Sequence, residues 1–315
     1  MPAPVPITFW HWAGFILIIL VFLAPDLGVF HRSSRVVKSK EALLWSALWF
    51  SIAILFARGL DVWRRPDESL EFVTGYFVEF SLSMDNVVAI ALIFTCFGVA
   101  ARHQHRVLFW GILGALIMRG MMIGLGAALI QTFRWTLYLL GAFLIFTGVK
   151  WGVSKQVAVQ PENNPVLRLA RRMFPVSSDY DGDKFLTWMD GRRAWTPLAL
   201  ALLMVETADV IFAVDSIPAV FAVTQKPFII FTSNIFAILG LRSLYFVVAG
   251  AIQYFRFLKA GLAGVLIFVG GKMLASRWVT VPTGLSLAVV AAMIALSMAL
   301  SIGHSTLAVR KEKRE

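Results

Sequence analysis

WTPLALALLMVETADVIFAVDSIPAVFAV, residues 195–223, decides the fold, because it is apolar almost throughout yet carries the acidic residues Glu206, Asp209 and Asp215. It is longer than the roughly 20 residues that an α-helix needs to cross a hydrocarbon core. Similar apolar runs recur along the chain, of which 59% is hydrophobic and 15% charged, whereas soluble proteins carry about 25% charged residues. The sequence therefore predicts an all-α, polytopic membrane protein.

We expect about nine transmembrane helices. They cover roughly 9–30, 41–57, 70–97, 106–131, 135–152, 195–223, 228–250, 258–276 and 280–304. The loops on one side of these spans hold 19 of the 29 Lys and Arg residues, and those on the other side hold 6. Because cytoplasmic loops are enriched in Lys and Arg, we expect the N-terminus outside and the C-terminus in the cytoplasm, in a bacterial inner membrane.

These spans divide the chain into five parts. Residues 1–57 form two N-terminal helices, 70–152 a first three-helix unit, 153–194 a cytoplasmic loop, 195–276 a second three-helix unit, and 280–304 a C-terminal helix. Within the loop, the stretch from Asn164 to Phe174 mixes apolar residues with arginines. We expect a short helix there, lying either on the lipid surface or in solvent.

The two three-helix units match one another in order. The matching segments are Glu79–Asn86 with Asp209–Ser216, Gly114–Arg119 with Ala237–Arg242, and Leu144–Lys150 with Leu266–Lys272. Each unit thus holds two acidic positions, an arginine and a lysine in the same sequence. Because each unit has an odd number of spans, its copies begin on opposite faces of the membrane. Such inverted repeats are the architecture of many secondary transporters.

Acidic residues inside spans need a physical reason, because a charged side chain at the bilayer centre costs at least about 2.5–3.5 kcal/mol. There are six of them: Asp26, Glu79, Asp85, Glu206, Asp209 and Asp215. Arg119 and Arg242 are the arginines at similar depth, so four negative charges lack a fixed partner, or two if Lys150 and Lys272 also reach inward. Bound cations or protonation must balance the remainder.

The side chains at these positions predict a cation site. The candidate metal ligands are Glu79, Asp85, Asn86, Glu206, Asp209, Asp215, Ser216 and, near the end of the first span, Asp26. Arg119 and Arg242 are candidate charge-balancing residues that restrain the acids when no metal is bound. Carboxylate, amide and hydroxyl oxygens suit Mn²⁺, Mg²⁺ or Ca²⁺ better than Zn²⁺ or Cu⁺. The alternative is structural: Glu79 pairs with one arginine and Asp209 with the other, as contacts between helices.

Geometry restricts how the second acidic motif can reach one ion. Glu206 and Asp209 share a face of a regular helix, whereas Asp215 points almost the opposite way. Pro218 cannot donate to the carbonyl of Val214. We therefore expect this helix to bend or unwind around residues 213–218; the first copy of the motif has no proline at that place.

The motifs resemble those of the TerC family of integral membrane proteins. The resemblance covers about residues 15–300 and lies in GYFVEFSLSMDNV (75–87), ETADVIFAVDSIPAVFAVT (206–224) and PFIIFTSNIFAILGLRSLYF (227–246). It implies an inverted-repeat helical membrane protein linked to manganese efflux and metal homeostasis, with a historical tellurium-resistance label. It also assigns the family's acidic positions to the candidate ligands named above. Many members have Lys where this chain has Phe80, so this site would be more negative.

The sequence thus predicts a transporter that exports a divalent cation, with Mn²⁺ the first choice and protons a candidate coupling ion. Ca²⁺/H⁺ exchange is the alternative within transport. An accessory membrane protein that supports metal loading or membrane-protein insertion is the alternative from another class, because the basic 153–194 loop offers a docking surface. We expect no enzyme activity, since no HExxH motif is present, and no cofactor apart from the transported ion. We expect the lipid bilayer as a partner and no nucleic acid, since the basic residues lie in short loops.

Overall fold

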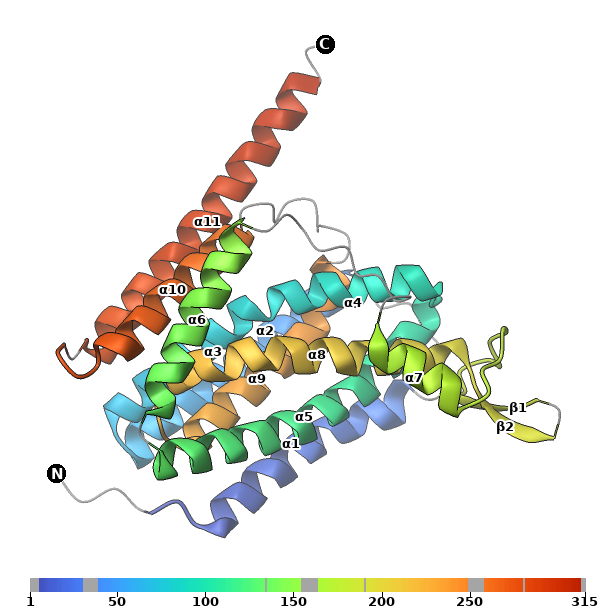
Figure 1. The fold of residues 1–315 in the computed structure, drawn as a ribbon, viewed down its shortest axis with the longest axis horizontal. Helices are drawn as coiled ribbons and strands as arrows, with labels where there is room; N and C mark the ends of the chain where they lie inside the picture. The colour runs from blue at the N-terminus through green and yellow to red at the C-terminus, as the bar shows by residue number, and fades with distance from the viewer. Residues whose placement is uncertain are drawn as a thin grey trace.

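The computed structural model describes residues 6–30, 39–133, 135–153, 164–189, 191–248, 258–279 and 281–312. Its elements are α1 (Phe9–Phe30), α2 (Ser39–Trp63), α3 (Pro66–Leu82), α4 (Met84–Phe97), α5 (Ala101–Thr132), α6 (Thr136–Val153), α7 (Pro165–Met173), β1 (Leu186–Met189), β2 (Arg192–Trp195), α8 (Pro197–Phe221), α9 (Pro227–Val248), α10 (Leu258–Ala275) and α11 (Thr283–Glu312). Figure 1 shows that the long helices form one bundle.

The all-α, polytopic membrane architecture is confirmed. Among the described residues, 6 helical segments are long and apolar enough to cross a membrane. Three shorter apolar helices accompany them, at Phe9–Leu23, Pro227–Gly240 and Ala260–Ala275. Helix occupies most of the described residues in each of the nine predicted ranges, but the number of spans that cross the bilayer stays a prediction.

Two helices differ in extent from the predicted spans. Helix α2 continues beyond residue 57 to Trp63 and carries the ion pair between Arg58 and Asp61, 3.7 Å, on its last turns. Charged side chains at a helix end can reach the polar interface without ending the helix. The third span is two helices, α3 and α4, which meet at Ser83. α4 then ends at Gly98, whose φ of 64° is the left-handed conformation that glycine adopts most readily.

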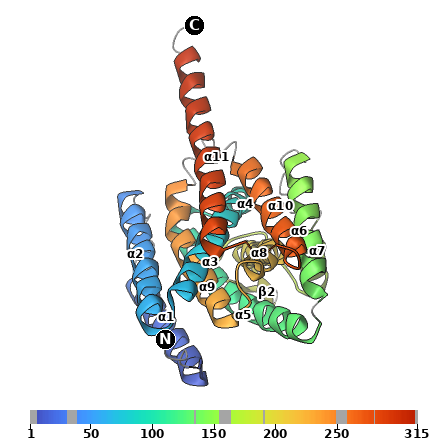
Figure 2. The same cartoon turned by 90° about the vertical axis from the view of Figure 1, so that its left-hand side faces the viewer.

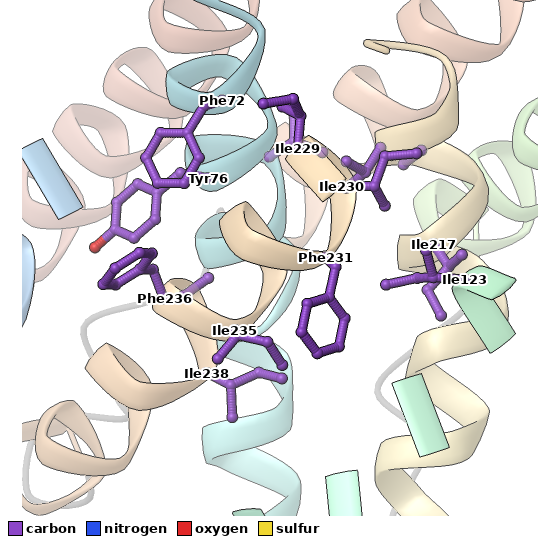
Figure 3. Close-up of a cluster of buried hydrophobic side chains, with 14 of the residues drawn as sticks. Phe72, Tyr76, Ile123, Ile217, Ile229, Ile230, Phe231, Ile235, Phe236 and Ile238 are labelled. Carbon is purple, nitrogen blue, oxygen red and sulfur yellow. The ribbon is translucent and has the colours of Figure 1, made fainter. Parts of the chain in front are cut away.

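Helix α9 forms the centre of the bundle. Its residues from Phe228 to Gly240 are all buried, and it packs against α2, α3, α4 and α5. Figure 3 shows aromatic residues of α3, Phe72 and Tyr76, against Phe236 of α9. A helix that is apolar on every side belongs in a protein interior, so the few polar residues of α9 are held away from lipid.

Helices α6 and α10 form a closely packed pair beside this centre. A Cβ atom added at Gly141 would lie 3.0 Å from the carbonyl oxygen of Gly270, and one added at Gly148 would lie 2.8 Å from that of Ala263. Small residues therefore let the two backbones approach each other. α11 packs along α10 and α3 and then projects beyond the rest of the bundle, as Figure 2 shows.

The predicted cytoplasmic loop contains more structure than expected. The short helix is confirmed as α7, with the Asn164 side chain accepting hydrogen bonds from the backbone at its N-terminus. The two strands β1 and β2, which sequence analysis did not predict, pair as an antiparallel hairpin. Asp183 pairs with Arg106 at the start of α5, which ties this unit to the bundle. Thr187 and then Lys184 donate to Asp181 and hold the pKa of its carboxyl below the usual range.

Candidate functional site

The candidate site is organised around Arg119, whose side chain is fully buried in the middle of α5. Its Nε and Nη2 donate to the two carboxylate oxygens of Asp209 on α8, at 3.2 and 2.8 Å. Its Nη1 donates to Glu79 on α3 and, at 2.9 Å, to the side-chain oxygen of Asn234 on α9. One guanidinium thus joins four helices, and two carboxylates against one cation leave a net negative charge.

This arrangement differs from the structural alternative that gave each acid its own arginine. Glu79 and Asp209, which match in the two repeats, both bind Arg119. The planar guanidinium fork allows this, because it presents five N–H groups in fixed directions. The side chains of Asp26, Asp85 and Arg242 lie outside those that the structure describes.

The break between α3 and α4 brings the first acidic motif to this cluster. Ser83 lies at the break, and its hydroxyl donates to Oε1 of Glu79 at 3.0 Å. Asn86, in the first turn of α4, donates to Oδ1 of Asp209 at 3.4 Å. Ser83 itself has φ −78° and ψ −6°, close to helical values, so the interruption between the two helices is local.

Of the predicted bending or unwinding at residues 213–218 in the second motif, the unwinding is wrong, and the bend stays a prediction. α8 is one helix from Pro197 to Phe221, and Pro218 lies within its last turns. A proline removes only one helical hydrogen bond, so near a helix end the surrounding packing can keep the helix intact. The interruption is found in the copy without a proline.

Several buried polar atoms of this region have no hydrogen-bond partner in the described structure. They are Oε2 of Glu79, Oδ1 of Asn86, Nδ2 of Asn234 and Oγ of Ser216. A buried polar group without a partner costs about 1–3 kcal/mol, so an ordered water or a bound ion would be a suitable partner for such a group. Three of the four are oxygens, which can accept a hydrogen bond or coordinate a hard cation.

Glu206 lies one turn before Asp209 on α8 and faces Gly114 of α5. A Cβ atom at Gly114 would lie 2.0 Å from Oε1 and 2.5 Å from Oε2 of Glu206. The carboxylate therefore occupies the space that a side chain at residue 114 would fill. Among the described side chains, no Lys or Arg forms a salt bridge with Glu206.

Asp215 lies apart from the Arg119 cluster, as its position on a continuous α8 requires. Thr147 of α6 donates to Oδ1 of Asp215 at 3.2 Å. Sequence analysis missed this residue, because one threonine in an apolar span makes no recognisable pattern. Ser216, the neighbour of Asp215, is buried. The second motif therefore serves two places, one at Glu206 and Asp209 and one at Asp215.

The described side chains do not form a ready-made metal site. No group of three or more His, Cys, Asp or Glu residues is placed among them to hold one metal ion. Arg119 instead occupies the position between Glu79 and Asp209 where a cation would be expected. Any metal-bound state must therefore differ from the arrangement described.

A second cluster of charges, which sequence analysis also missed, lies at the N-terminal end of α3, opposite the end that holds Glu79. Glu68 is buried and binds Arg64 at 2.8 Å and Lys226 at 3.4 Å. Lys226 also binds Glu71 at 3.0 Å, and Thr224 donates to Glu71 at 2.7 Å. These contacts join the start of α3 to the connection between α8 and α9.

Comparisons with known proteins agree with the resemblance seen in the motifs. The sequence profile described as "Integral membrane protein TerC family" matches residues 64–313. An uncharacterized membrane protein of Myxococcus xanthus is 51% identical over 293 residues, which cover 92% of this chain and 91% of that protein. A protein of Escherichia coli (strain K12) named "Putative membrane-bound redox modulator Alx" is 40% identical over 299 residues, covering 92% and 93%. No solved structure matches the chain.

Proposed function

This chain belongs to the TerC family of integral membrane proteins, and on that premise we propose that it exports a divalent metal cation, Mn²⁺ before others, across the bacterial inner membrane. The observation that carries the proposal is the excess of acid within the bundle. Glu79 is buried there, and Glu206, Asp209 and Asp215 are partly buried. Among the described side chains, Arg119 forms salt bridges with Glu79 and Asp209. A transported cation would balance the rest.

The chemistry of the site supports a hard cation. Oε2 of Glu79 and Oδ1 of Asn86 are buried acceptors without a donor, and Ser216, beside Asp215, has a buried hydroxyl without a partner among the described residues. Oxygen donors of this kind favour Mn²⁺, Mg²⁺ or Ca²⁺, while soft metals prefer thiolates. The sequence has one cysteine, Cys96, which is exposed.

The packing of α6 against α10 supports the inverted repeat. Matching Leu144 with Leu266 relates the two units by an offset of 122 residues. The contact of Gly141 with Gly270 then maps onto the contact of Ala263 with Gly148, since 263 − 141 and 270 − 148 both equal 122. A pair of contacts that exchange under the same offset is what a two-fold axis between the units produces. Such an axis is the basis of alternating access in many transporters.

Exposed aromatic residues fit a membrane–water interface at one end of the bundle. Several lie at the helix ends on the side with few Lys and Arg residues: Phe9 and Trp10, Trp63, Phe133 and Trp135, and Trp278. Tryptophan and other aromatic rings are enriched at both membrane–water interfaces. They support a membrane boundary at this end of the bundle, whereas the orientation rests on the distribution of Lys and Arg.

Topology gives the first test. Reporter fusions placed after residues 35 and 160 are expected to report the cytoplasm, and fusions after 65 and 226 the outside, because the basic loops stay inside. Alkaline phosphatase and a fluorescent protein provide opposite readouts for each position. The inverted repeat would be wrong if the α3 and α8 spans crossed the membrane in the same direction.

Gly114→Ala tests whether the position of Glu206 matters. The added methyl group would displace the Glu206 carboxylate, while the helices keep their packing because the end of a flexible side chain can move. We expect normal membrane levels and about a tenfold lower apparent affinity for Mn²⁺, within the usual range for coupled neighbouring groups. Gly124→Ala is the matched control, since nothing lies within 4 Å of its Cβ position on the same helix. Equal affinities of the two variants would contradict the prediction.

The function itself is tested by the metal content of cells with and without the protein. Cells that lack it are expected to accumulate Mn²⁺ when manganese is supplied, and complementation should lower the content again. Inside-out vesicles should then show Mn²⁺ uptake that depends on the protein. An unchanged Mn²⁺ content in both assays would reject manganese export.

The same assays separate the alternatives. A change in Ca²⁺ content alone would favour Ca²⁺/H⁺ exchange. The accessory role is favoured if deletion within 153–194 abolishes the cellular phenotype while vesicle flux persists. That loop presents exposed basic residues on α7 and on the hairpin, which suit an acidic partner.

A further inference from the structure

The cluster as described offers too few free oxygens for a divalent cation. Oε1 of Glu79 accepts hydrogen bonds from Arg119 and Ser83, and both oxygens of Asp209 accept from Arg119. In the first acidic motif, Oε2 of Glu79 and Oδ1 of Asn86 are buried acceptors that receive no hydrogen bond. A hard divalent cation takes about six to eight oxygen ligands. Arg119 must therefore release its carboxylates before such an ion can bind.

A displaced Arg119 needs another anion, because an unpaired guanidinium inside the bundle would be costly. The direction in which its side chain can move follows from the register of α5 and α8. The contacts between the two helices pair Gly111 with Val205, Gly114 with Glu206 and Arg119 with Asp209. Because the residue numbers increase in the same direction along both helices, α5 and α8 run parallel. Glu206 thus lies on the side of Asp209 that is nearer the N-terminus of α5.

That side is the one a helical arginine reaches most easily, since long side chains on a helix point back toward its N-terminus. Glu206 is three residues from Asp209, a rise of about 4.5 Å along α8. Its carboxylate lies against the backbone of α5 at Gly114, on the same helix as Arg119. No described Lys or Arg forms a salt bridge with it. It is therefore an anion within one helical turn of the present partner of Arg119.

We propose that Glu206 is the positioning carboxylate onto which Arg119 moves when a divalent cation takes Glu79 and Asp209. The inference rests on the proposed cation transport and deepens it. Glu206 then acts through Arg119 and does not coordinate the metal. The charges agree with this exchange: three carboxylates and one guanidinium carry two net negative charges, which one divalent cation neutralises. The absence of a side chain at Gly114 leaves the space that Glu206 uses.

Mn²⁺ binding to the purified protein tests this role. Glu206→Gln is expected to weaken Mn²⁺ binding about tenfold or more, as expected when a coupled charge is lost, because Arg119 would have no second anion. Glu206→Asp keeps the charge and should bind within a few-fold of the wild type. The electron paramagnetic resonance spectrum of Mn²⁺ at saturation should be the same in wild type and Glu206→Gln, because the metal ligands are unchanged. Asp61→Asn, at the surface of α2, is the matched control.

A double-mutant cycle provides the second arm. With Arg119→Met as background, Glu206→Gln should no longer weaken Mn²⁺ binding, because there is no displaced guanidinium that must pair with a carboxylate. An effect of equal size in both backgrounds would overturn the inference. A changed Mn²⁺ spectrum in Glu206→Gln would also overturn it, by making Glu206 a ligand. The spectrum decides the question even if Arg119→Met cannot be purified. Absence of Mn²⁺ binding by the wild type, in contrast, would reject the proposed function itself.

Discussion

Replacing Arg119 with Gln is expected to destabilise the folded protein by about 3–5 kcal/mol, the usual cost of removing one partner from a buried ion pair. Its guanidinium is fully buried and satisfies Glu79, Asp209 and Asn234 together. Without it, two buried carboxylates would lack a cation. We expect low membrane levels and a lowered melting temperature, measured by tryptophan fluorescence of the detergent-purified protein.

Two further variants make this prediction specific. Arg58→Gln is the matched control, because the Arg58 side chain is 80% exposed, and it should leave stability unchanged. Arg119→Met combined with Glu79→Gln and Asp209→Asn should recover much of the stability, since replacing a whole buried ion cluster by neutral groups is often tolerated. Full stability of Arg119→Gln alone would show that the acids do not depend on Arg119.

Asp215→Asn is expected to abolish manganese export while membrane levels stay normal. The change preserves the size of the side chain and removes one charge. A dehydrated divalent cation at the Asp215 position, which lies apart from the Arg119 cluster on the proposed transport path, should lose several kcal/mol of binding free energy. Insertion should not suffer, because a neutral amide is easier to place in lipid than a carboxylate. The measurement is intracellular Mn²⁺ in complemented cells, which should rise toward the level of cells that lack the protein.

Asp85→Asn, at the matching position of the first repeat, is expected to behave in the same way. Asp61→Asn is the control away from the acidic motifs, at the end of α2, where the carboxylate pairs with exposed Arg58. Normal expression and wild-type export by both Asp85→Asn and Asp215→Asn would remove the case for metal transport. The accessory role would then become the better explanation.

The parts of this structure that hydropathy controls could be predicted from the sequence. Apolar runs mark α2, α5 and α8 because lipid tolerates few other compositions. Charged residues within such runs are rare, so the acids of α3 and α8 and Arg119 of α5 point to the candidate site. Partner choice could not be predicted in the same way. That Asp209 binds Arg119 depends on which helices meet, and nothing in either helix alone encodes it.

Two local features were missed for separate physical reasons. The break at Ser83 has no proline or glycine to mark it, and it is associated with hydrogen bonds to partners distant in sequence. The Glu68 and Glu71 cluster lies at a helix start, where acidic residues are common, so these two glutamates did not indicate a site. The cluster forms only when folding brings Lys226 next to Glu68 and Glu71.

The break at Ser83 gives the two related halves different mechanical behaviour. α3 and α4 are joined end to end at Ser83, so this segment can bend there, and a bend would move α4 against α8 and α9, on which it packs. α8 is one rod and can only tilt or slide as a whole. We therefore expect the first half to bend and the second half to move as a rigid unit, so that the two related halves move differently when the site opens to one side of the membrane or the other.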